Sequence, residues 1–401
     1  MTLAFGHPYL AIPGPSVMPD RVQRAMHRGS PNIYEGGLLD LVESLWPDLR
    51  AVAGTKHHVA AYISNGHGGW EAATANLFSR GEKALVLATG TFGLSWANHA
   101  RAMGIEVELI DFGKETPVDP ERFEAVLRKD LKHQIKAVLV THVDTATTVR
   151  NDIPALRRAI DAAGHPALLA VDCIASMGCD EYRMDDWGVD VTVAASQKGL
   201  MTPPGLAFVW FNEKARLRCQ GSDLASPYWN WQPRAQATEF YQHWDGTAPT
   251  AHLYALREAL TMLVQEEGIA AAWHRHEVLA RTVWAAFEAW GRGNDQIGLN
   301  VSRPEWRGRS VTAARFGAPH ATRLREWCEH KAGVTLGIGL GMAAPDDPAY
   351  HGYLRVAHMG HVSAHMTLGA LAVMDAGLKA LAIPHGAGAL EAAAMVIAKG
   401  A

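Results

Sequence analysis

Runs rich in apolar residues alternate with amphipathic stretches between about residue 60 and residue 211. The amphipathic stretches have the periodicity of helices, and the apolar runs between them have the length of strands. They predict buried strands over 84–88, 105–111, 137–142, 167–173, 191–195 and 206–211. Such alternation of strand and helix predicts an α/β fold, in which a mostly parallel sheet has helices on both faces.

The patterns outside this sheet predict further helices and a second domain. We expect helices over 38–53, from Trp70 to 77, over 253–267 and over 270–290. We expect the aromatic loop at 225–239 to lie at an interface. Beyond it we expect strands 311–315 and 353–356, a helix at 323–332, a turn at 337–341, and an alanine-rich helix over 371–399 that is interrupted at 383–388. The expected division is an arm at 1–20, a large domain at 21–291 that includes a connecting helix, and a small C-terminal domain at 292–401.

A lysine and an aspartate stand at the ends of two predicted strands. Lys198 follows strand 191–195, and Asp172 lies at the end of strand 167–173. Parallel strands bring their carboxyl ends to one edge of the sheet, where open α/β folds bind ligands. Desolvation there lowers the pKa of a lysine toward a reactive amine, which can form a Schiff base with a carbonyl. Such a pair suits pyridoxal phosphate, whereas a surface loop lysine is the simpler alternative.

Composition narrows the possible partners and the compartment. The 401 residues suggest two or three domains, at about 150 residues each. A net charge of −4 gives no basic surface for nucleic acid. The chain has four cysteines without a CxxC pair, which favours a reducing, cytoplasmic location. No apolar run reaches about 18 residues, so we expect no membrane span. Prolines interrupt the N-terminal stretch, which has no positively charged start before an apolar run, so we expect no signal peptide.

The segment VDCIASMG…DDWGVDVTVAASQKGLMTPPGLAF closely resembles the cofactor segment of class V aminotransferases, which are pyridoxal-phosphate enzymes of fold type I. Within this class it looks most like the serine–glyoxylate and alanine–glyoxylate branch. The resemblance extends from IPGPSVMP near the start to YLRVAHMG near the end. It implies a large domain with a seven-stranded type of sheet between helices, and a smaller C-terminal α/β domain.

The resemblance also implies roles for individual residues. Besides Lys198 and Asp172, the implied cofactor-binding residues are Gly66, His67 and Gly68 in the phosphate turn, Phe92 on the ring, Thr145 near the ring oxygen or phosphate, Gln197, and Thr247 from a neighbouring subunit. Arg355 matches the arginine that binds the substrate carboxylate, and the substrate is expected near Pro13 and Gly14. The chain departs from the family at Asp144, Thr148 and Trp244, where a glutamate, a glycine and a tyrosine are usual.

We therefore expect an aminotransferase that moves an amino group from serine or alanine to glyoxylate, or to a similar 2-oxo acid, by a ping-pong mechanism. The alternatives are another donor (aspartate, pyridoxamine or another amine), a lyase or cysteine desulfurase, or a cofactor-binding protein without activity. We expect Tyr34 and Glu35 to tune donor choice. We also expect a homodimer with active sites at its interface, with a tetramer left open, and no metal site.

Overall fold

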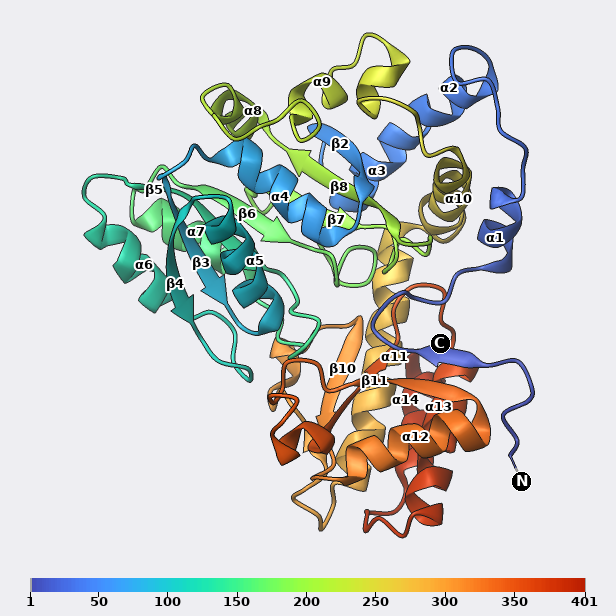
Figure 1. The fold of residues 1–401 in the computed structure, drawn as a ribbon. Helices are drawn as coiled ribbons and strands as arrows, with labels where there is room; N and C mark the ends of the chain where they lie inside the picture. Colours follow the sequence, from blue (N-terminus) through green and yellow to red (C-terminus); the bar gives the residue numbers. More distant parts are fainter. Residues whose placement is uncertain (1, 401) are drawn as a thin grey trace.

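The computed structural model describes residues 2–400 and contains two sheets joined by a long helix, α11 (Ile269–Trp290). Figure 1 shows the larger sheet above and the smaller one below. The larger sheet has seven strands in the order β2-β8-β7-β6-β5-β3-β4. They are β2 (His58–Ser64), β3 (Lys83–Ala88), β4 (Glu106–Asp111), β5 (Ile135–Thr141), β6 (Leu168–Asp172), β7 (Val191–Ala195) and β8 (Gly205–Phe211). Only β8 runs antiparallel to its neighbours, which confirms the mostly parallel α/β fold.

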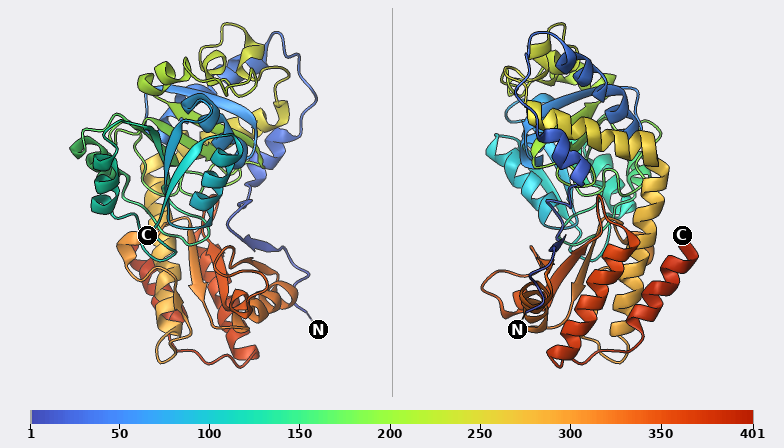
Figure 2. Two further views of the ribbon diagram at one scale, coloured as in Figure 1. Left: turned by 60° about the vertical axis from the view of Figure 1, so that its left-hand side comes forward. Right: turned by 90° about the vertical axis from the view of Figure 1, so that its right-hand side faces the viewer.

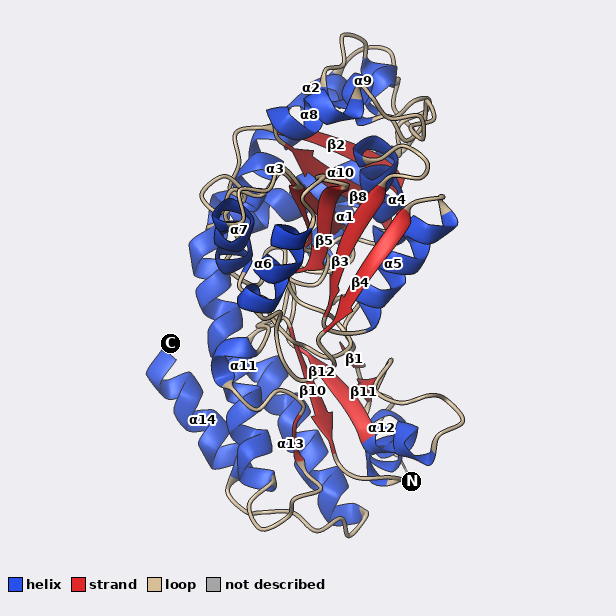
Figure 3. Cartoon of the chain, turned by 90° about the vertical axis from the view of Figure 1, so that its left-hand side faces the viewer, coloured by secondary structure: helices blue, strands red, loops and turns tan. Residues whose placement is uncertain are grey.

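Helices cover both faces of this sheet (Figure 3). One face packs against α4 (Gly66–Leu77) and α5 (Thr91–Ala102), and the other against α6 (Pro120–Lys129) and α7 (Ile153–Ala162). Both faces of the central strands are therefore shielded from water, so their sequences are nearly all apolar. Every residue of β6 and β7 is buried, including Asp172 at the end of β6.

Short helices complete the large domain around β2 and β8. They are α1 (Asp20–Met26), α2 (Gly37–Glu43), α3 (Leu45–Ala53), α8 (Glu213–Cys219), α9 (Trp231–Ala235), the 3-10 turn Phe240–His243, α10 (Thr250–Leu260) and a π-helical segment at Thr261–Glu267. None of the helices described between residues 2 and 400 is both long and apolar enough to cross a membrane.

The smaller sheet has the strand order β1-β11-β12-β10-β9. Its strands are β1 (Tyr9–Ala11), β9 (Gly298–Leu299), β10 (Val311–Arg315), β11 (Val334–Ile338) and β12 (Tyr353–Ala357), and its helices are α12 (His320–Ala332), α13 (Ala364–Ala380) and α14 (Ala389–Gly400). Helices α11, α13 and α14 lie side by side in Figure 2. Strand β1 belongs to the N-terminal arm and pairs in parallel with β11, so the arm runs from the small sheet toward the large one.

Four expectations about local structure are wrong, each for an identifiable reason. The helix expected over 38–53 breaks at Ser44, because Pro47 cannot donate to the carbonyl of Glu43 and its ring clashes with that carbonyl. The helix expected from Trp70 begins at Gly66, since the side chain of Asn65 caps the N–H groups of the first turn.

The turn expected at 337–341 is in part strand β11, where Gly337 pairs with Arg355. A Cβ on Gly337 would lie 2.7 Å from Pro13 Cδ, so glycine here serves close packing of the arm and not a turn. The loop at 225–239 contains α9, and Trp231 is fully buried and stacked on Phe211 at 4.3 Å. That tryptophan belongs to the core and not to an interface.

Arg234 on α9 ties the 226–249 segment to the large sheet. Its side chain is only 1% exposed, and its guanidinium donates to the carbonyls of Tyr228, Ala61 and His243. The same group lies over the rings of Tyr62 and Tyr228, at 4.5 and 4.6 Å. A buried cation paired with neutral carbonyls is held by these hydrogen bonds and by cation–π contacts.

Replacement of Arg234 by Met is expected to lower the free energy of unfolding by about 3 kcal/mol, because one buried and two partly buried carbonyls lose their donor. Urea unfolding followed by circular dichroism measures the change. Arg216→Met is the matched control, because Arg216 pairs at 2.6 Å with the half-exposed Glu213, and such a pair contributes less than about 1 kcal/mol. Equal losses in the two variants would contradict the role assigned to Arg234.

Candidate active site

A cavity of about 230 Å³ opens at the carboxyl edge of the large sheet, between the strand ends and the first turns of α4 and α5. Thr145 follows β5, Asp172 ends β6, and Lys198 follows β7. The structure thus brings seven of the predicted site residues to one place. The lining residues are Asn65, Gly66, His67, Trp70, Phe92, Thr145, Asp172, Ile174, Gln197 and Lys198.

Lys198 lies against the N-terminal arm. Its Nζ donates a hydrogen bond to the carbonyl of Pro13. Gly14 has φ of +107°, and a Cβ there would lie 2.6 Å from Nζ, so both the backbone and the space require glycine. The hydroxyl of Ser16 donates to the carbonyl of Lys198 at 2.7 Å, which fixes the arm on the lysine loop. Burial and, next, the charge of Arg355 lower the pKa of Lys198 to about 8.

Asp172 is buried beneath the cavity and accepts two hydrogen bonds. The backbone N–H of Ile174 donates to Oδ1 at 2.6 Å, and the indole N–H of Trp70 donates to Oδ2 at 3.0 Å. Burial raises the pKa of Asp172 to about 7, although both hydrogen bonds and the charge of Lys198 act in the opposite direction. A cationic partner in the cavity would therefore stabilise the ionised form of this carboxyl.

The first turn of α4 forms one wall of the cavity. Asn65 Oδ1 accepts from the N–H groups of His67 and Gly68, at 3.1 and 3.4 Å. Gly68 itself lies against Ser64 and Trp229, where a Cβ would clash. Opposite, Oε1 of Gln197 is buried and has no hydrogen-bond partner among the described residues. A helix N-terminus suits an anion such as a phosphate, whereas the unsatisfied oxygen of Gln197 calls for a hydrogen-bond donor.

Asp144 holds two walls of the cavity together. Its carboxylate accepts from the N–H groups of Phe92 and Gly93 at the start of α5, at 2.8 and 3.3 Å. It also accepts from Ala146 and Thr147 in its own loop, at 2.9 and 3.4 Å. Although Asp144 stands where a glutamate is usual, its carboxylate binds the backbone of both Phe92 and the Thr145 loop.

Arg355 on β12 brings the small sheet to the cavity. Its Nε donates to the carbonyl of Ile338 at 2.8 Å, and its Nη1 donates to the carbonyl of Thr145 at 2.9 Å. The side chain is buried, and burial lowers its pKa to about 10, whereas Asp144 raises it. Since the guanidinium stays charged, Nη2 can bind a carboxylate that enters between the two domains.

Three predicted residues lie away from this cavity in the single chain. Tyr34 is 84% exposed, and Glu35 is exposed and accepts from Asn32 at 3.2 Å. Thr247 is exposed in the segment after the 3-10 turn. None of the three lines the cavity that contains Lys198. Conversely, the sequence reasoning missed Asn65, Trp70 and Ile174, of which only Asn65 left a signal, as a helix cap before glycines.

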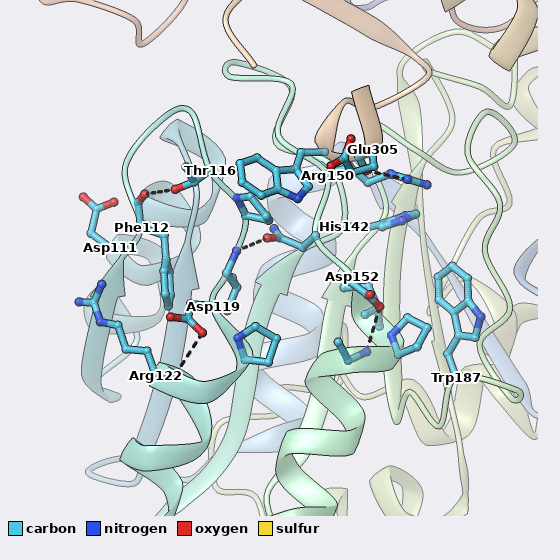
Figure 4. A pocket seen from close by; sticks show the side chains of 18 residues that line it. Asp111, Phe112, Thr116, Asp119, Arg122, His142, Arg150, Asp152, Trp187 and Glu305 are labelled. Atoms are coloured by element: carbon cyan, nitrogen blue, oxygen red, sulfur yellow. Dashed lines mark hydrogen bonds between the residues drawn. The ribbon is translucent and has the colours of Figure 1, made fainter. Parts of the chain in front are cut away.

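A larger cavity of about 880 Å³ lies on the other face of the large sheet, at the starts of α6 and α7 (Figure 4). His142 and Trp187 line it, together with Arg122 and Arg150. His142 shares a hydrogen bond of 3.0 Å with Ser176, and burial lowers its pKa to about 3. None of the predicted site residues lines this cavity, so the candidate active site remains the one that contains Lys198.

Comparisons with known proteins agree with this geometry. Residues 40–364 match the family model described as aminotransferase class V. The serine–glyoxylate aminotransferase of Methylorubrum extorquens is 36% identical over 93% of each chain, and the L-aspartate–glyoxylate aminotransferase of Paracoccus denitrificans is 34% identical over 96% of this chain and 94% of that one. The pyridoxamine–pyruvate aminotransferase structure from Mesorhizobium loti superimposes with a TM-score of 0.88 over both whole chains, at 22% identity. The chain belongs to the class V aminotransferase family, as its cofactor segment predicted.

Proposed function

We propose that this aminotransferase binds pyridoxal phosphate and moves an amino group from a small amino acid, serine or alanine, to glyoxylate or a similar 2-oxo acid. The observation that carries the proposal is that Lys198 and Asp172 line one cavity of about 230 Å³, while Arg355, from a third segment, contacts its lining residue Thr145. The relatives named above support glyoxylate as the acceptor. The two half-reactions would alternate in one site, which is a ping-pong scheme.

The residues present fit pyridoxal phosphate. Asp172 would hold the protonated pyridine nitrogen, and Phe92 would lie on the ring. The phosphate would bind at the first turn of α4, and the unsatisfied Oε1 of Gln197 would accept from a hydrogen-bond donor of the bound group. Thr145 would supply its hydroxyl to the ring oxygen or phosphate. This group supplies an aldehyde that carries the amino group and a ring that takes up electrons from the substrate Cα.

The protein's own groups would bind the substrate and move its proton. Lys198, with its lowered pKa, would hold the cofactor aldehyde and then, as a free amine, take the proton from the donor Cα. Asp172 would keep the ring nitrogen protonated. The carbonyl of Pro13 would orient Nζ between these tasks, because it accepts from Nζ in the resting site. Arg355 would fix the donor by its carboxylate.

The site favours a small, uncharged donor side chain. Among the described residues that line the cavity, Lys198 is the only lysine or arginine, and His67 is kept neutral because burial lowers its pKa. Aspartate remains the second candidate donor, supported by the relative from Paracoccus denitrificans. A desulfurase needs a reactive thiolate, whereas all four cysteines are buried and burial raises the pKa of each thiol.

The proposal includes a homodimer in which Thr247 serves the partner's phosphate site, supported by the exposure of Thr247 and by its absence from the lining of the cavity in its own chain. Tyr34 and Glu35 would contribute to donor choice across the same interface. We place the enzyme in the cytoplasm, since its free cysteines suit a reducing compartment.

Titration of the cofactor-loaded enzyme with L-serine, L-alanine and L-aspartate, each without an acceptor, tests the proposed function. Serine or alanine is expected to convert the absorbance of the bound aldehyde form to that of the amine form, because one half-reaction is complete without an acceptor. Lys198→Ala is expected to abolish the conversion.

The ranking of the donors provides the control. Conversion by aspartate alone would replace the proposed donor with the second candidate, and no conversion by any of the three would overturn the donor class. Tyr34→Phe and Glu35→Gln are expected to change the ranking. An unchanged order in both variants would remove these residues from donor choice.

The rate at which the apoenzyme captures pyridoxal phosphate covalently is expected to rise with pH and to level off above about 8. Only the neutral amine of Lys198 attacks the aldehyde, and its pKa is lowered to about 8, so the reactive form is lost below that value. Stopped-flow absorbance across the pH range measures the midpoint. A rate that still increases through pH 10 would show a lysine with an ordinary pKa.

Mixed dimers of Lys198→Ala and Thr247→Ala subunits test whether Thr247 acts across the interface. If it does, the only site with a lysine in the mixed dimer has a native Thr247, and its affinity for pyridoxal phosphate should equal that of the wild type. The Thr247→Ala homodimer should bind about tenfold more weakly, as expected for one hydrogen bond to a charged group. Equal weakness in the mixed dimer would place Thr247 in its own site.

A further inference from the structure

Trp70 contacts Asp172 in the candidate active site, although nothing in the local sequence around Trp70 predicts this contact. It lies in the second turn of α4, its side chain is 1% exposed, and it lines the cavity. Its indole N–H donates to Oδ2 of Asp172 at 3.0 Å. The other carboxylate oxygen accepts from the N–H of Ile174. The Asp172 carboxyl is therefore the acceptor in both of the hydrogen bonds found for it within residues 2–400.

The surrounding rings hold the indole in place. Trp96 stacks on it, with ring centroids 5.9 Å apart and planes 11° apart. His67 and Phe92 meet it edge-on, at 4.6 and 6.4 Å. A buried tryptophan packed on several sides by aromatic rings cannot turn its N–H elsewhere without disturbing all of them. The donor is therefore fixed before any ligand arrives.

We propose that Trp70 is the positioning residue for Asp172: its indole N–H orients the carboxylate toward the cavity and favours the ionised form over the neutral acid. The inference rests on the proposed function, in which Asp172 faces a cationic ring nitrogen. A carboxylate accepts about four hydrogen bonds, so Trp70 and Ile174 leave acceptor capacity for that nitrogen. Trp70 touches Asp172 and acts through it.

The balance at Asp172 explains why one donor matters. Burial raises its pKa to about 7, and the nearby charge of Asp144 acts in the same direction. Ile174, Trp70 and Lys198 oppose them. Burial and, next, the charge of Asp172 raise the pKa of the adjacent Cys173 thiol. With a midpoint so close to neutral pH, the loss of one donor moves Asp172 from partly ionised to mostly protonated, and a neutral acid stabilises a cationic nitrogen poorly.

The test reads Asp172 directly in the apoenzyme. The protein is labelled with ¹³C at the aspartate carboxyls, and the infrared band of the protonated acid is followed against pH, with Asp172→Asn used to identify the signal. The wild-type midpoint is expected near about 7. Trp70→Phe is expected to lower the acid dissociation constant about tenfold, as the loss of a hydrogen bond to a charged group implies.

Trp96→Phe is the matched control. Trp96 is a fully buried tryptophan of the same cluster, but its indole N–H donates to Thr74 and not to Asp172. Its loss should leave the midpoint unchanged. Coincident midpoints for Trp70→Phe and Trp96→Phe would overturn the proposal, because a purely structural role predicts the same effect from both. Failure of the enzyme to transaminate would leave this readout intact, so the two proposals fail separately.

A second replacement covers the case in which Trp70→Phe does not fold. Benzothienylalanine at position 70 keeps the shape of the bicyclic ring and replaces its N–H by sulfur, so only the donor is lost. The same shift of the Asp172 midpoint is expected, together with an approximately tenfold weaker affinity of the apoenzyme for pyridoxal phosphate. A native midpoint with the thiophene ring in place would show that the indole N–H does not control Asp172.

Discussion

The four hydrogen bonds accepted by Asp144 join the parts from which the site is built. Two of them come from the start of α5, and two come from the loop after β5. The loop carbonyl of Thr145 then accepts from Arg355, which stands on the small sheet. One buried carboxylate thus connects the start of α5 with Phe92, the loop with Thr145, and Arg355 beyond it. A Cβ on Gly90 would lie 2.6 Å from its Cγ, so the surrounding backbone is fitted closely to this shorter acid.

Lys198, Asp172 and Arg355 stand at or beside the cavity, and none of them forms an ion pair with another of the described residues. Burial shifts the pKa of Lys198 down, of Asp172 up and of Arg355 down, each toward the neutral form. Such burial weakens the fold unless ligands supply the missing partners. Phosphate, ring nitrogen, aldehyde and substrate carboxylate together would meet each of these needs. The site is therefore costly to keep unliganded and well suited to a tightly bound cofactor.

The sequence predicted most of the fold and the candidate site residues Asp172 and Lys198, because strands and their ends are recognisable from local patterns. Apolar runs such as 167–173 and 191–195 are buried on both faces and show plainly as strands, and their ends placed Asp172 and Lys198 together. Arg355 could be assigned only through resemblance, because one arginine in a strand has no local signal for a ligand. The break at Ser44 follows from Pro47. The prediction of one helix over 38–53 gave the amphipathic pattern more weight than this proline.

The contacts of Trp70 and Asp144 could not be read from the chain, because they join residues far apart in sequence. Trp70 is 102 positions from Asp172, and its spacing on α4 is that of an ordinary core residue. Thr247, Tyr34 and Glu35 differ in kind, because the roles proposed for them would depend on a second subunit. Sequence patterns thus predicted which groups would carry the chemistry, and the structure shows what those groups contact.

The replacement of the usual tyrosine by Trp244 shows how the Thr247 segment is supported in this chain. Trp244 is buried and stacks on Trp46, at 6.4 Å, and its indole N–H has no partner among the described residues. It therefore anchors the segment by packing on Trp46. His243, just before it, is held by Arg234 in both directions, since its carbonyl accepts from Arg234 and its ring donates to the carbonyl of Arg234. The segment is thus held by the packing of Trp244 in the core. Thr247 is the polar residue at its exposed end.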